Sequence, residues 1–216
     1  MRLSLIGMAG TGKSHWSAKL SAQGFKRYGC DDLIAGKLTG MLKRPDGSTM
    51  RMGEWMGFPF EAGHKARETR YLALELEVMR DLIERLEIAK GEANEHVVID
   101  TTGSVIYTGD PVMRRLKRQT TVVYLATPPD VEAQLLDAYV RQPHPMVWRH
   151  SFSKKPHESN RDALARCYPI LLSDRRKRYA QYADVSVDFH QCREAGFGPH
   201  DFLALIREHA KKHEKA

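Results

Sequence analysis

Residues 2–14 read Arg-Leu-Ser-Leu-Ile-Gly-Met-Ala-Gly-Thr-Gly-Lys-Ser, and this stretch decides the fold of the chain. Gly7, Gly12, Lys13 and Ser14 satisfy the pattern G-x-x-x-x-G-K-[ST]. An apolar run of a strand's length precedes the pattern, and a helix-compatible stretch follows it. A plain glycine turn is the alternative, but turn geometry requires neither the lysine nor the serine. The order of strand, glycine loop and helix therefore predicts a phosphate-binding loop.

Each residue type in this loop has a physical role toward a triphosphate. Glycines let the backbone curl so that successive N–H groups point inward at an anion. We expect Lys13 to reach the β- and γ-phosphates and the Ser14 hydroxyl to bind Mg²⁺. The following helix directs the positive end of its dipole at the same anion. ATP and Mg²⁺ are the expected cofactors, with the nucleotide bound by Gly7, Gly10, Thr11, Gly12, Lys13, Ser14 and His15.

The composition indicates one globular α/β protein. The chain has 216 residues, of which 42% are apolar, and this suffices for a full hydrophobic core. No stretch approaches about 18 consecutive apolar residues, and the first residues lack the apolar region of a signal peptide. Three cysteines without paired spacing are typical of reduced thiols. We therefore expect a cytoplasmic protein with no membrane partner.

A net charge of +7 admits two explanations, nucleic acid or a basic cleft for an anionic nucleotide and an anionic substrate. The basic residues are spread over predicted helices and one loop, without a stripe interleaved with aromatic residues. This distribution favours the cleft. The expected partner is a small anionic molecule rather than nucleic acid, and the expected oligomeric state is a monomer or a weak homodimer.

Predicted strands and helices alternate along the whole chain. Near-continuous apolar strands separated by helices indicate a parallel sheet that is covered on both faces. We predict a three-layer α/β sandwich with a five-stranded parallel sheet, a P-loop NTPase fold, as a single domain over residues 1–216. The five strands are expected at residues 3–6, 25–28, 97–100, 121–125 and 185–188.

Two segments depart from this alternation. The segment from about residue 36 to about residue 63 is polar and rich in Gly and Met, and we assign it to a substrate-binding insertion. Residues of about 141–160 contain three prolines, three histidines and many basic groups, which predicts a mobile lid. Ser159 and Asp162 have the spacing of a capping box, so the next helix is expected to begin there and to continue to about Tyr182.

Acidic residues follow two of the predicted strands, and a parallel sheet gathers its ligands at the carboxyl ends of its strands. Asp100 ends an apolar run in the manner of an acid that binds Mg²⁺, although an Asp that caps a loop has the same pattern. Asp31 and Asp32 can cap the next helix, or one of them can position the substrate hydroxyl or take its proton. The expected metal ligands are Ser14, Asp100 and Asp32.

Basic side chains follow in the predicted lid and near the end of the following helix. Arg141, Arg149 and two lysines of the lid can exclude water and add positive charge over a transferring phosphate, or they can form a solvated loop. Arg175 opens a run of four basic residues, most of which should face solvent. One of the four can instead turn inward and bind a carboxylate through two contacts.

The chain resembles the shikimate kinase family, small P-loop kinases of the nucleoside-monophosphate-kinase type, over nearly its whole length. Besides the glycine loop, residues 24–34 resemble the family's second-strand region, which ends in an acid-x-acid motif before an isoleucine. Counting back from Ile34 puts Asp31 on the second acid, and the resemblance implies that it binds the substrate hydroxyls. The first acid falls on Gly29, so its role beside Mg²⁺ is unfilled or passes to Asp32.

Two further family motifs are matched in the second half of the chain. The Arg-Pro motif of the family's lid resembles Arg141-Gln142-Pro143, with one residue inserted. The family's ending, Arg-x-x-x-Tyr followed by Ala-Asp, is matched by Arg175, Tyr179 and Ala183-Asp184. The resemblance implies that Arg175 binds the substrate carboxylate.

The sequence also departs from the family at several places. Where the family has three glycines after its third strand, this chain reads Thr102-Gly103-Ser104, so the substrate pocket should be smaller or differently shaped. The Phe-Arg pair that opens the family's long helix has no direct match, and Arg67 and Arg70 are the candidates for its role. The 36–63 segment and the lid are longer than in typical members. The expected substrate-binding residues are Asp31, Arg67, Arg70, Thr102, Gly103 and Arg175.

These features together predict a transferase that moves the γ-phosphate of ATP to an alcohol group of a small anionic metabolite, as a shikimate kinase does. The expected catalytic residues are Lys13 on the phosphates, Asp31 on the acceptor hydroxyl, and Arg141 (or Arg149) over the transition state. A nucleoside or nucleotide kinase is an alternative that the Thr-Gly-Ser replacement and the longer loops permit. A nucleotide-binding regulatory protein without an acceptor is another, which Gly29 in the acid motif favours.

Overall fold

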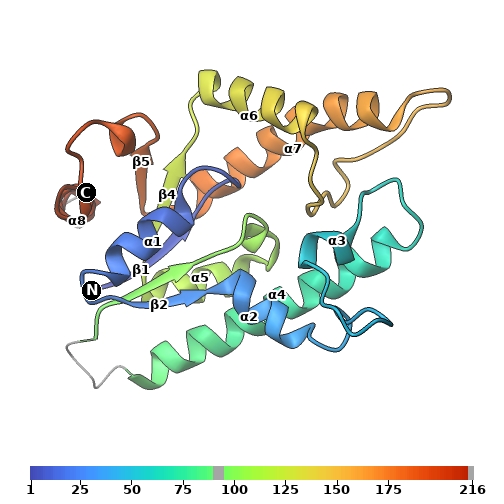
Figure 1. The fold of residues 1–216 in the computed structure, drawn as a ribbon. Helices are drawn as coiled ribbons and strands as arrows, with labels where there is room; N and C mark the ends of the chain where they lie inside the picture. Colours follow the sequence, from blue (N-terminus) through green and yellow to red (C-terminus); the bar gives the residue numbers. More distant parts are fainter. Residues whose placement is uncertain (90–94, 214–216) are drawn as a thin grey trace.

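Five short strands form an all-parallel sheet at the centre of the molecule (Figure 1). This computed structural model describes residues 1–89 and 95–213. The strand order is β2-β3-β1-β4-β5, so the strand that leads into the glycine loop lies in the middle. The strands are β1 (Arg2–Ile6), β2 (Lys26–Gly29), β3 (Val97–Asp100), β4 (Thr121–Ala126) and β5 (Val185–Asp188).

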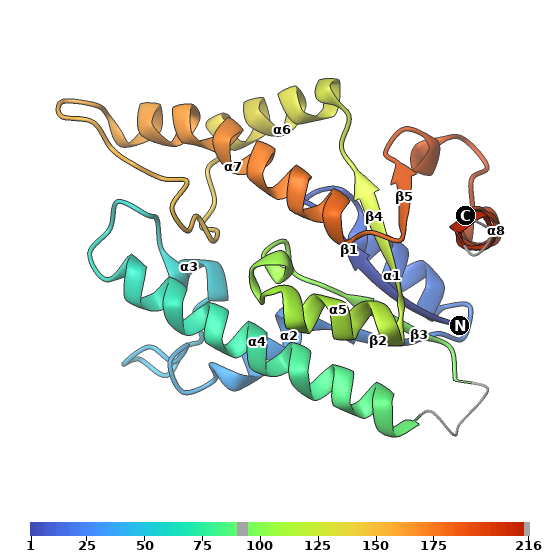
Figure 2. The ribbon, with the colours of Figure 1, turned by 180° about the vertical axis from the view of Figure 1, so that it is seen from behind.

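Helices cover both faces of this sheet (Figure 2). Side chains alternate between the faces of a strand: Leu3 and Leu5 of β1 belong to one apolar core and Ile6 to the other. The helices of the described chain are α1 (Lys13–Ser21), α2 (Cys30–Lys37), α3 (Met52–Met56), α4 (His64–Ile88), α5 (Asp110–Gln119), α6 (Pro129–Arg141), α7 (Asn160–Tyr182) and α8 (Pro199–His213), together with the short 3₁₀ turns η2 (Val105–Tyr107) and η3 (Gln191–Arg193).

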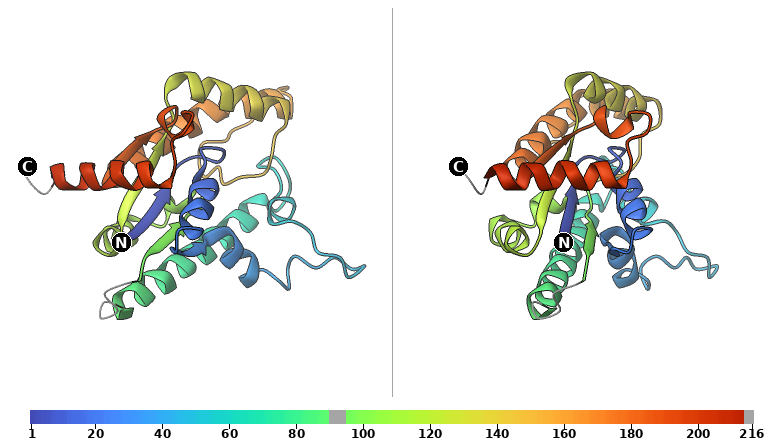
Figure 3. Two further views of the ribbon diagram at one scale, coloured as in Figure 1. Left: turned by 60° about the vertical axis from the view of Figure 1, so that its left-hand side comes forward. Right: turned by 90° about the vertical axis from the view of Figure 1, so that its left-hand side faces the viewer.

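The smaller of the two cores joins α1 and the C-terminal helix α8, which runs along the outside of the molecule (Figure 3). Trp16 of α1 stacks on Phe202 of α8, with 4.4 Å between the ring centroids. The larger core is formed by α2, α4, α5 and α7 on the opposite face. Each helix layer therefore packs on its own face of the sheet through an apolar core. Because β1 contributes to both cores, the start of the loop between β1 and α1 is held in place.

The observed architecture confirms the predicted fold class, while local details differ. Asp31 and Asp32 do not cap α2, because the helix already begins at Cys30 and its N-cap residue is Gly29. Both acids lie in the first turn, where a negative charge is favoured by the helix dipole. The 36–63 segment contains the short helix α3, which the sequence reading did not anticipate. Among the described residues, no helix is long and apolar enough to cross a membrane.

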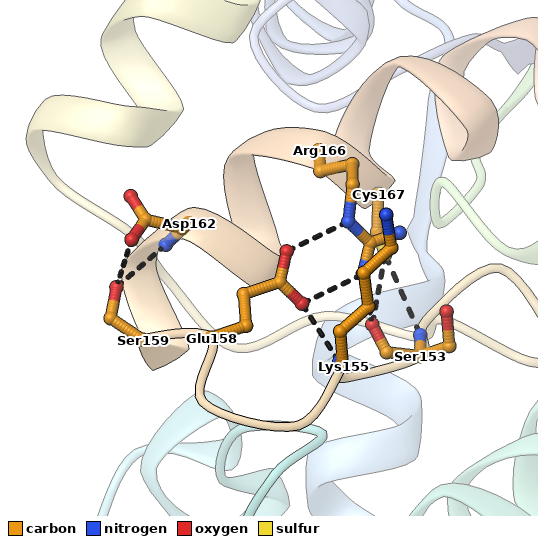
Figure 4. Close-up of polar contacts among 7 residues, drawn as sticks. All are labelled: Ser153, Lys155, Glu158, Ser159, Asp162, Arg166 and Cys167. Carbon is orange, nitrogen blue, oxygen red and sulfur yellow. Dashed lines mark hydrogen bonds and ion pairs between the residues drawn. The ribbon is translucent and has the colours of Figure 1, made fainter.

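The segment between α6 and α7, residues 142–159, is here called the lid segment. Its C-terminal part is bonded to the start of α7 (Figure 4). Arg166 of α7 donates to both carboxylate oxygens of Glu158 at 2.8 Å and to the Ser153 carbonyl at 2.8 Å. The Ser159 hydroxyl accepts from the Asp162 amide at 3.1 Å, which confirms the predicted start of this helix. The lid segment is therefore fixed at this end by charged and capping contacts.

Candidate active site

The glycine loop connects β1 to α1 at the carboxyl edge of the sheet. Gly7 and Gly12 have φ values of 146° and 103°, in the region that L side chains rarely adopt. A β-carbon on Gly7 would also lie 3.0 Å from the Leu125 carbonyl oxygen, so this glycine keeps the loop close to β4. The Thr11 hydroxyl donates to the Met8 carbonyl at 2.9 Å and closes the loop on itself. The loop therefore has glycine conformations and a close approach to β4 that other residues would not allow.

Lys13 extends across this loop rather than into solvent. Its ammonium donates to the carbonyl oxygens of Gly7 at 2.9 Å and Met8 at 3.0 Å. Burial lowers the pKa of Lys13 to about 8, although the carboxylates of Asp100 and Asp31 act in the opposite direction. A buried cation with only two carbonyl partners is well suited to neutralise a phosphate that enters the loop.

A cavity of about 320 Å³ lies beside the glycine loop, and we call it the central cavity. Its walls come from the glycine loop, α2, α3, α4, the turn after β3, the lid segment and α7. The side of the cavity formed by the lid segment and α3 is rich in apolar groups, whereas α2 and α7 contribute charge. The lining residues are Met8, Ala9, Asp31, Met52, Gly53, Met56, Tyr71, Thr102, Gly103, Ser104, His144, Pro145, Met146, Val147 and Arg175.

Arg175 of α7 is the buried cation of the central cavity, with 3% of its surface exposed. Its guanidinium donates to the Val147 carbonyl at 2.6 Å and lies 5.7 Å from the centroid of the Tyr107 ring. Its Nε atom has no hydrogen-bond partner among the residues that the structure describes. A β-carbon at Gly103 would come within 3.1 Å of the guanidinium, so the glycine leaves it room. An anionic ligand in this cavity would complete the contacts of Arg175.

Asp31 of α2 also lines the central cavity. The Tyr71 hydroxyl contacts its Oδ1 atom at 3.5 Å. Partial burial raises the pKa of Asp31, with Asp100 adding repulsion, while the Lys13 ammonium lowers it. A carboxylate with a raised pKa, next to the glycine loop, can accept a proton from a hydroxyl in the central cavity. Of the two neighbouring acids, Asp31 therefore lines the cavity.

Asp32 points elsewhere. Its Oδ2 atom lies 2.8 Å from the point where a β-carbon of residue 29 would be, so its carboxylate stands beside Gly29. Gly29 is paired in register with Asp100 of the neighbouring strand. The Asp32 carboxylate thus lies where the side chain of residue 29 would begin if that residue were an acid.

Asp100 is the third acid at this edge of the sheet, and it is buried. Its Oδ2 atom accepts from Ser17 at 3.0 Å and from Arg27 at 2.7 Å. Hydroxyl and carboxylate oxygens of Ser14, Asp32 and Asp100 are the donor types that Mg²⁺ prefers, and this ion usually keeps waters and phosphate oxygens as its other ligands. The described residues contain no group of three or more His, Cys, Asp or Glu side chains with metal-binding geometry. Ser14, Asp32 and Asp100 therefore fit a Mg²⁺ ion that takes most of its ligands from nucleotide phosphates and water.

The turn after β3 is formed by Thr102, Gly103 and Ser104. The hydroxyls of Thr102 and Ser104 both donate to Oε1 of Glu75 on α4, the second at 2.9 Å. Glu75 has 1% of its surface exposed, and burial raises its pKa to about 7 against the opposing effect of the two hydroxyls. This buried carboxyl group was not identified from the sequence.

Three arginines that were predicted for the substrate or the transition state are not among the residues that line the central cavity. Arg67 donates to the carbonyls of Met56 at 2.9 Å and Ala62 at 3.2 Å and so supports the loop before α4. Arg70 is exposed on α4. Arg141, at the end of α6, has 74% of its side chain exposed and forms an ion pair with Asp137 at 2.5 Å. The structure therefore brings Lys13, Asp31, Thr102, Gly103 and Arg175 together and leaves these three arginines apart.

The sequence reading also missed two basic residues near the glycine loop. Arg193 of η3 donates to the carbonyls of Gly10 at 3.4 Å and Thr11 at 3.5 Å. Arg27 of β2 is bound to Asp100 and donates to the Ser17 hydroxyl at 2.8 Å. Neither belongs to a motif: Arg193 contacts the loop itself, whereas Arg27 contacts α1 and β3, and the fold alone brings each to this place.

Comparisons with known proteins support the fold. No protein-family model matches the chain, and no curated protein matches it in sequence. Solved structures do match: the shikimate kinase from Acinetobacter baumannii in complex with shikimate is 21% identical with a TM-score of 0.56, and the match covers 99% of this chain and 94% of that chain. The shikimate kinase from Aquifex aeolicus is 20% identical with a TM-score of 0.55, covering 99% and 96%.

A third match is the shikimate kinase from Bacteroides thetaiotaomicron, with 18% identity, a TM-score of 0.54, and coverage of 100% of this chain and 96% of that chain. At such identities the likeness concerns the fold. The chain therefore has the P-loop fold of the shikimate kinases, as the motifs predicted, and its chemistry is argued from its own residues.

Proposed function

We propose that the protein is a kinase that transfers the γ-phosphate of ATP to a hydroxyl group of a small anionic metabolite, in the manner of a shikimate kinase. The observation that carries the proposal is the central cavity, which opens beside the glycine loop and is lined by both Asp31 and Arg175. A base and a buried cation in one cavity of this size suit a compact hydroxy acid.

Each residue of the site has a part in this proposal. Lys13 and the amides of the loop bind the phosphates of ATP, and Ser14, Asp32 and Asp100 hold Mg²⁺, which supplies charge neutralisation. Asp31 orients the acceptor hydroxyl and takes its proton, while Arg175 binds the acceptor's carboxylate or phosphate. The lid segment, which contributes Met146 and Val147 to the cavity wall, excludes water during transfer.

The test is ADP formation from ATP and Mg²⁺ with a panel of acceptors that contains shikimate, other hydroxy acids and nucleosides. We expect a compact hydroxy acid to stimulate turnover at least tenfold over the rate without an acceptor. Stimulation by nucleosides alone would favour a nucleoside kinase. No stimulation by any compound would refute the kinase proposal and favour a nucleotide-binding regulatory protein.

Arg175→Lys tests the anchor separately, because an ammonium group cannot reproduce the two-pronged contact of a guanidinium. We expect the KM for the acceptor to rise roughly tenfold or more, a loss typical of a charged hydrogen bond, while the KM for ATP changes little. Arg176→Lys is the matched control, because Arg176 is exposed and pairs with Glu132 on α6. Equal effects of the two substitutions would remove Arg175 from acceptor binding.

A further inference from the structure

One wall of the central cavity is built around a buried carboxyl group. Thr102 and Ser104 line the cavity, and behind them Oε1 of Glu75 accepts a hydrogen bond from each hydroxyl. Oε2 of Glu75 has no partner among the described residues. Glu75 itself does not line the cavity, so it can affect a ligand only through the two hydroxyls.

The direction of these hydrogen bonds follows from the number of protons available. An ionised carboxylate only accepts, and a hydroxyl has one proton to donate. The hydroxyls of Thr102 and Ser104 therefore both donate their protons to Glu75. The two hydroxyl oxygens lie 3.1 Å apart, but with both protons on Glu75 neither donates to the other. The Thr102 oxygen also accepts from the Ser104 amide at 3.1 Å, and the Tyr71 hydroxyl contacts Asp31 at 3.5 Å. Toward a ligand, these two hydroxyl oxygens can therefore only accept hydrogen bonds.

We propose that Glu75 is a positioning residue, which holds the Thr102 and Ser104 hydroxyls as hydrogen-bond acceptors toward the central cavity. The cavity would then select a hydroxy acid that carries a second hydroxyl, one that donates to this wall. This inference rests on the proposed function and makes its acceptor more specific. The acceptor has three polar groups: an anionic group at Arg175, the reacting hydroxyl at Asp31, and a donor at the Glu75-supported wall. Its remaining surface contacts the methionines of the cavity.

The proposal also implies a dependence on pH. When Glu75 takes up a proton, it can donate to one of the two hydroxyls, and that hydroxyl can then donate into the cavity. The groups that act on Glu75 are Tyr71 on its own helix, Cys30 and Asp31 on α2, and Arg175 and Tyr179 on α7. Burial raises the pKa of Cys30, Tyr71 and Tyr179, so these stay neutral near pH 7.

Binding of shikimate and of its monodeoxy analogues, measured by calorimetry with a non-hydrolysable ATP analogue at pH 8, tests the proposal. In the unchanged protein we expect at least one analogue to bind roughly tenfold more weakly than shikimate, the loss expected for one hydrogen bond. Glu75→Leu removes the acceptor and frees the hydroxyl protons to donate into the cavity, so it should reduce this ratio to about twofold. Glu84→Leu on the exposed side of α4 is the matched control and should keep the ratio. An unchanged ratio in Glu75→Leu would overturn the inference.

A second experiment requires no acceptor. The ¹³Cβ resonances of Thr102 and Ser104 are followed from pH 5 to pH 9 in the ligand-free protein. We expect both to shift with one midpoint near 7, close to the pKa of Glu75, and the shift to vanish in Glu75→Gln but not in Glu84→Gln. Resonances that do not respond to pH, or that respond equally in Glu75→Gln, would overturn the inference. If no hydroxy acid is phosphorylated, the proposed function fails, whereas this titration still decides the role of Glu75.

Discussion

Lys13 combines burial with a contact to two carbonyl oxygens of its own loop. Such an arrangement keeps the ammonium in place before a nucleotide arrives, so little side-chain entropy is lost on binding. The cost is that removal from water lowers the pKa of Lys13 to about 8. The side chain is therefore charged at neutral pH and loses its proton in mildly alkaline solution.

This gives a prediction for nucleotide binding. A phosphate in the loop favours the charged form of Lys13, so binding must take up a proton once the pH exceeds about 8. The affinity for a non-hydrolysable ATP analogue should fall by up to roughly tenfold per pH unit between pH 8 and 9.5. Calorimetry in buffers of different ionisation enthalpy measures both the affinity and the proton uptake.

One variant tests this prediction and a second serves as its control. Lys13→Met should weaken binding at every pH and remove the dependence on pH, whereas Lys19→Met on the same helix should behave as the unchanged protein. An affinity that stays constant from pH 7 to pH 9.5 in the unchanged protein would show that the buried ammonium does not titrate in this range.

At the scale of elements, the start of α7 depends on the Ser159 cap (Figure 4). Replacement of a capping serine by alanine leaves a helix amide without its partner and costs about 1 kcal/mol. Ser159→Ala should lower the free energy of unfolding in urea by this amount. Ser21→Ala, at the exposed end of α1, should change it by much less. Equal stability of the two variants would mean that the cap contributes nothing measurable.

The end of α6 carries Arg141, which lies outside the central cavity and pairs with Asp137. If the lid segment closes over bound ATP, Arg141 is released from this exposed pair at little cost. We predict that Arg141→Ala lowers kcat by roughly a thousandfold, as for other arginines that stabilise phosphoryl transfer, while the affinity for ATP hardly changes. Arg161→Ala, exposed at the start of α7, is the control. An unaltered kcat in Arg141→Ala would remove this residue from the mechanism.

At the scale of the whole molecule, the stability of the fold is linked to Glu75. Its pKa is about 7 in the folded protein and near 4.5 in an exposed chain, so the folded state binds the extra proton between these values. The free energy of unfolding must then fall as the pH rises from about 4.5 to about 7, and this contribution is constant above that window.

We predict how the difference in free energy of unfolding between Glu75→Gln and the unchanged protein depends on pH. Glu75→Gln lacks the titrating group, so its stability relative to the unchanged protein should increase as the pH rises from 4.5 to 7. Urea unfolding at several pH values measures this gap. Glu84→Gln, the same substitution at an exposed position of α4, is the control. A constant gap for Glu75→Gln would contradict the raised pKa of the buried carboxyl.

The sheet and the loop after β1 were predictable because their signals are local. Apolar strands, glycines and the Lys-Ser pair lie within a few residues of one another, and a parallel sheet brings its strand ends together. Arg67 illustrates the opposite case. Nothing in the neighbouring sequence distinguishes an arginine that turns into a cavity from one that supports a loop through carbonyl contacts.

Glu75 was missed although the sequence carries a signal for it. It lies four residues after Tyr71 and four before Met79, on the face of α4 that is buried. A carboxyl group at a helical position otherwise occupied by apolar side chains is costly unless it has hydrogen-bond partners. Those partners, Thr102 and Ser104, are on a distant turn and can be identified only once α4 is packed against the turn after β3.

Four of the residues around the central cavity are methionines: Met8, Met52, Met56 and Met146. Their thioethers give the cavity adaptable walls, but the same sulfur atoms react with peroxide. Conversion to the sulfoxide would place a polar, chiral group in the wall of the central cavity. Under the proposed function, this oxidation would weaken acceptor binding, and methionine sulfoxide reductases could reverse the change. Of the four, only Met8 belongs to the glycine loop, so nucleotide binding should be affected less.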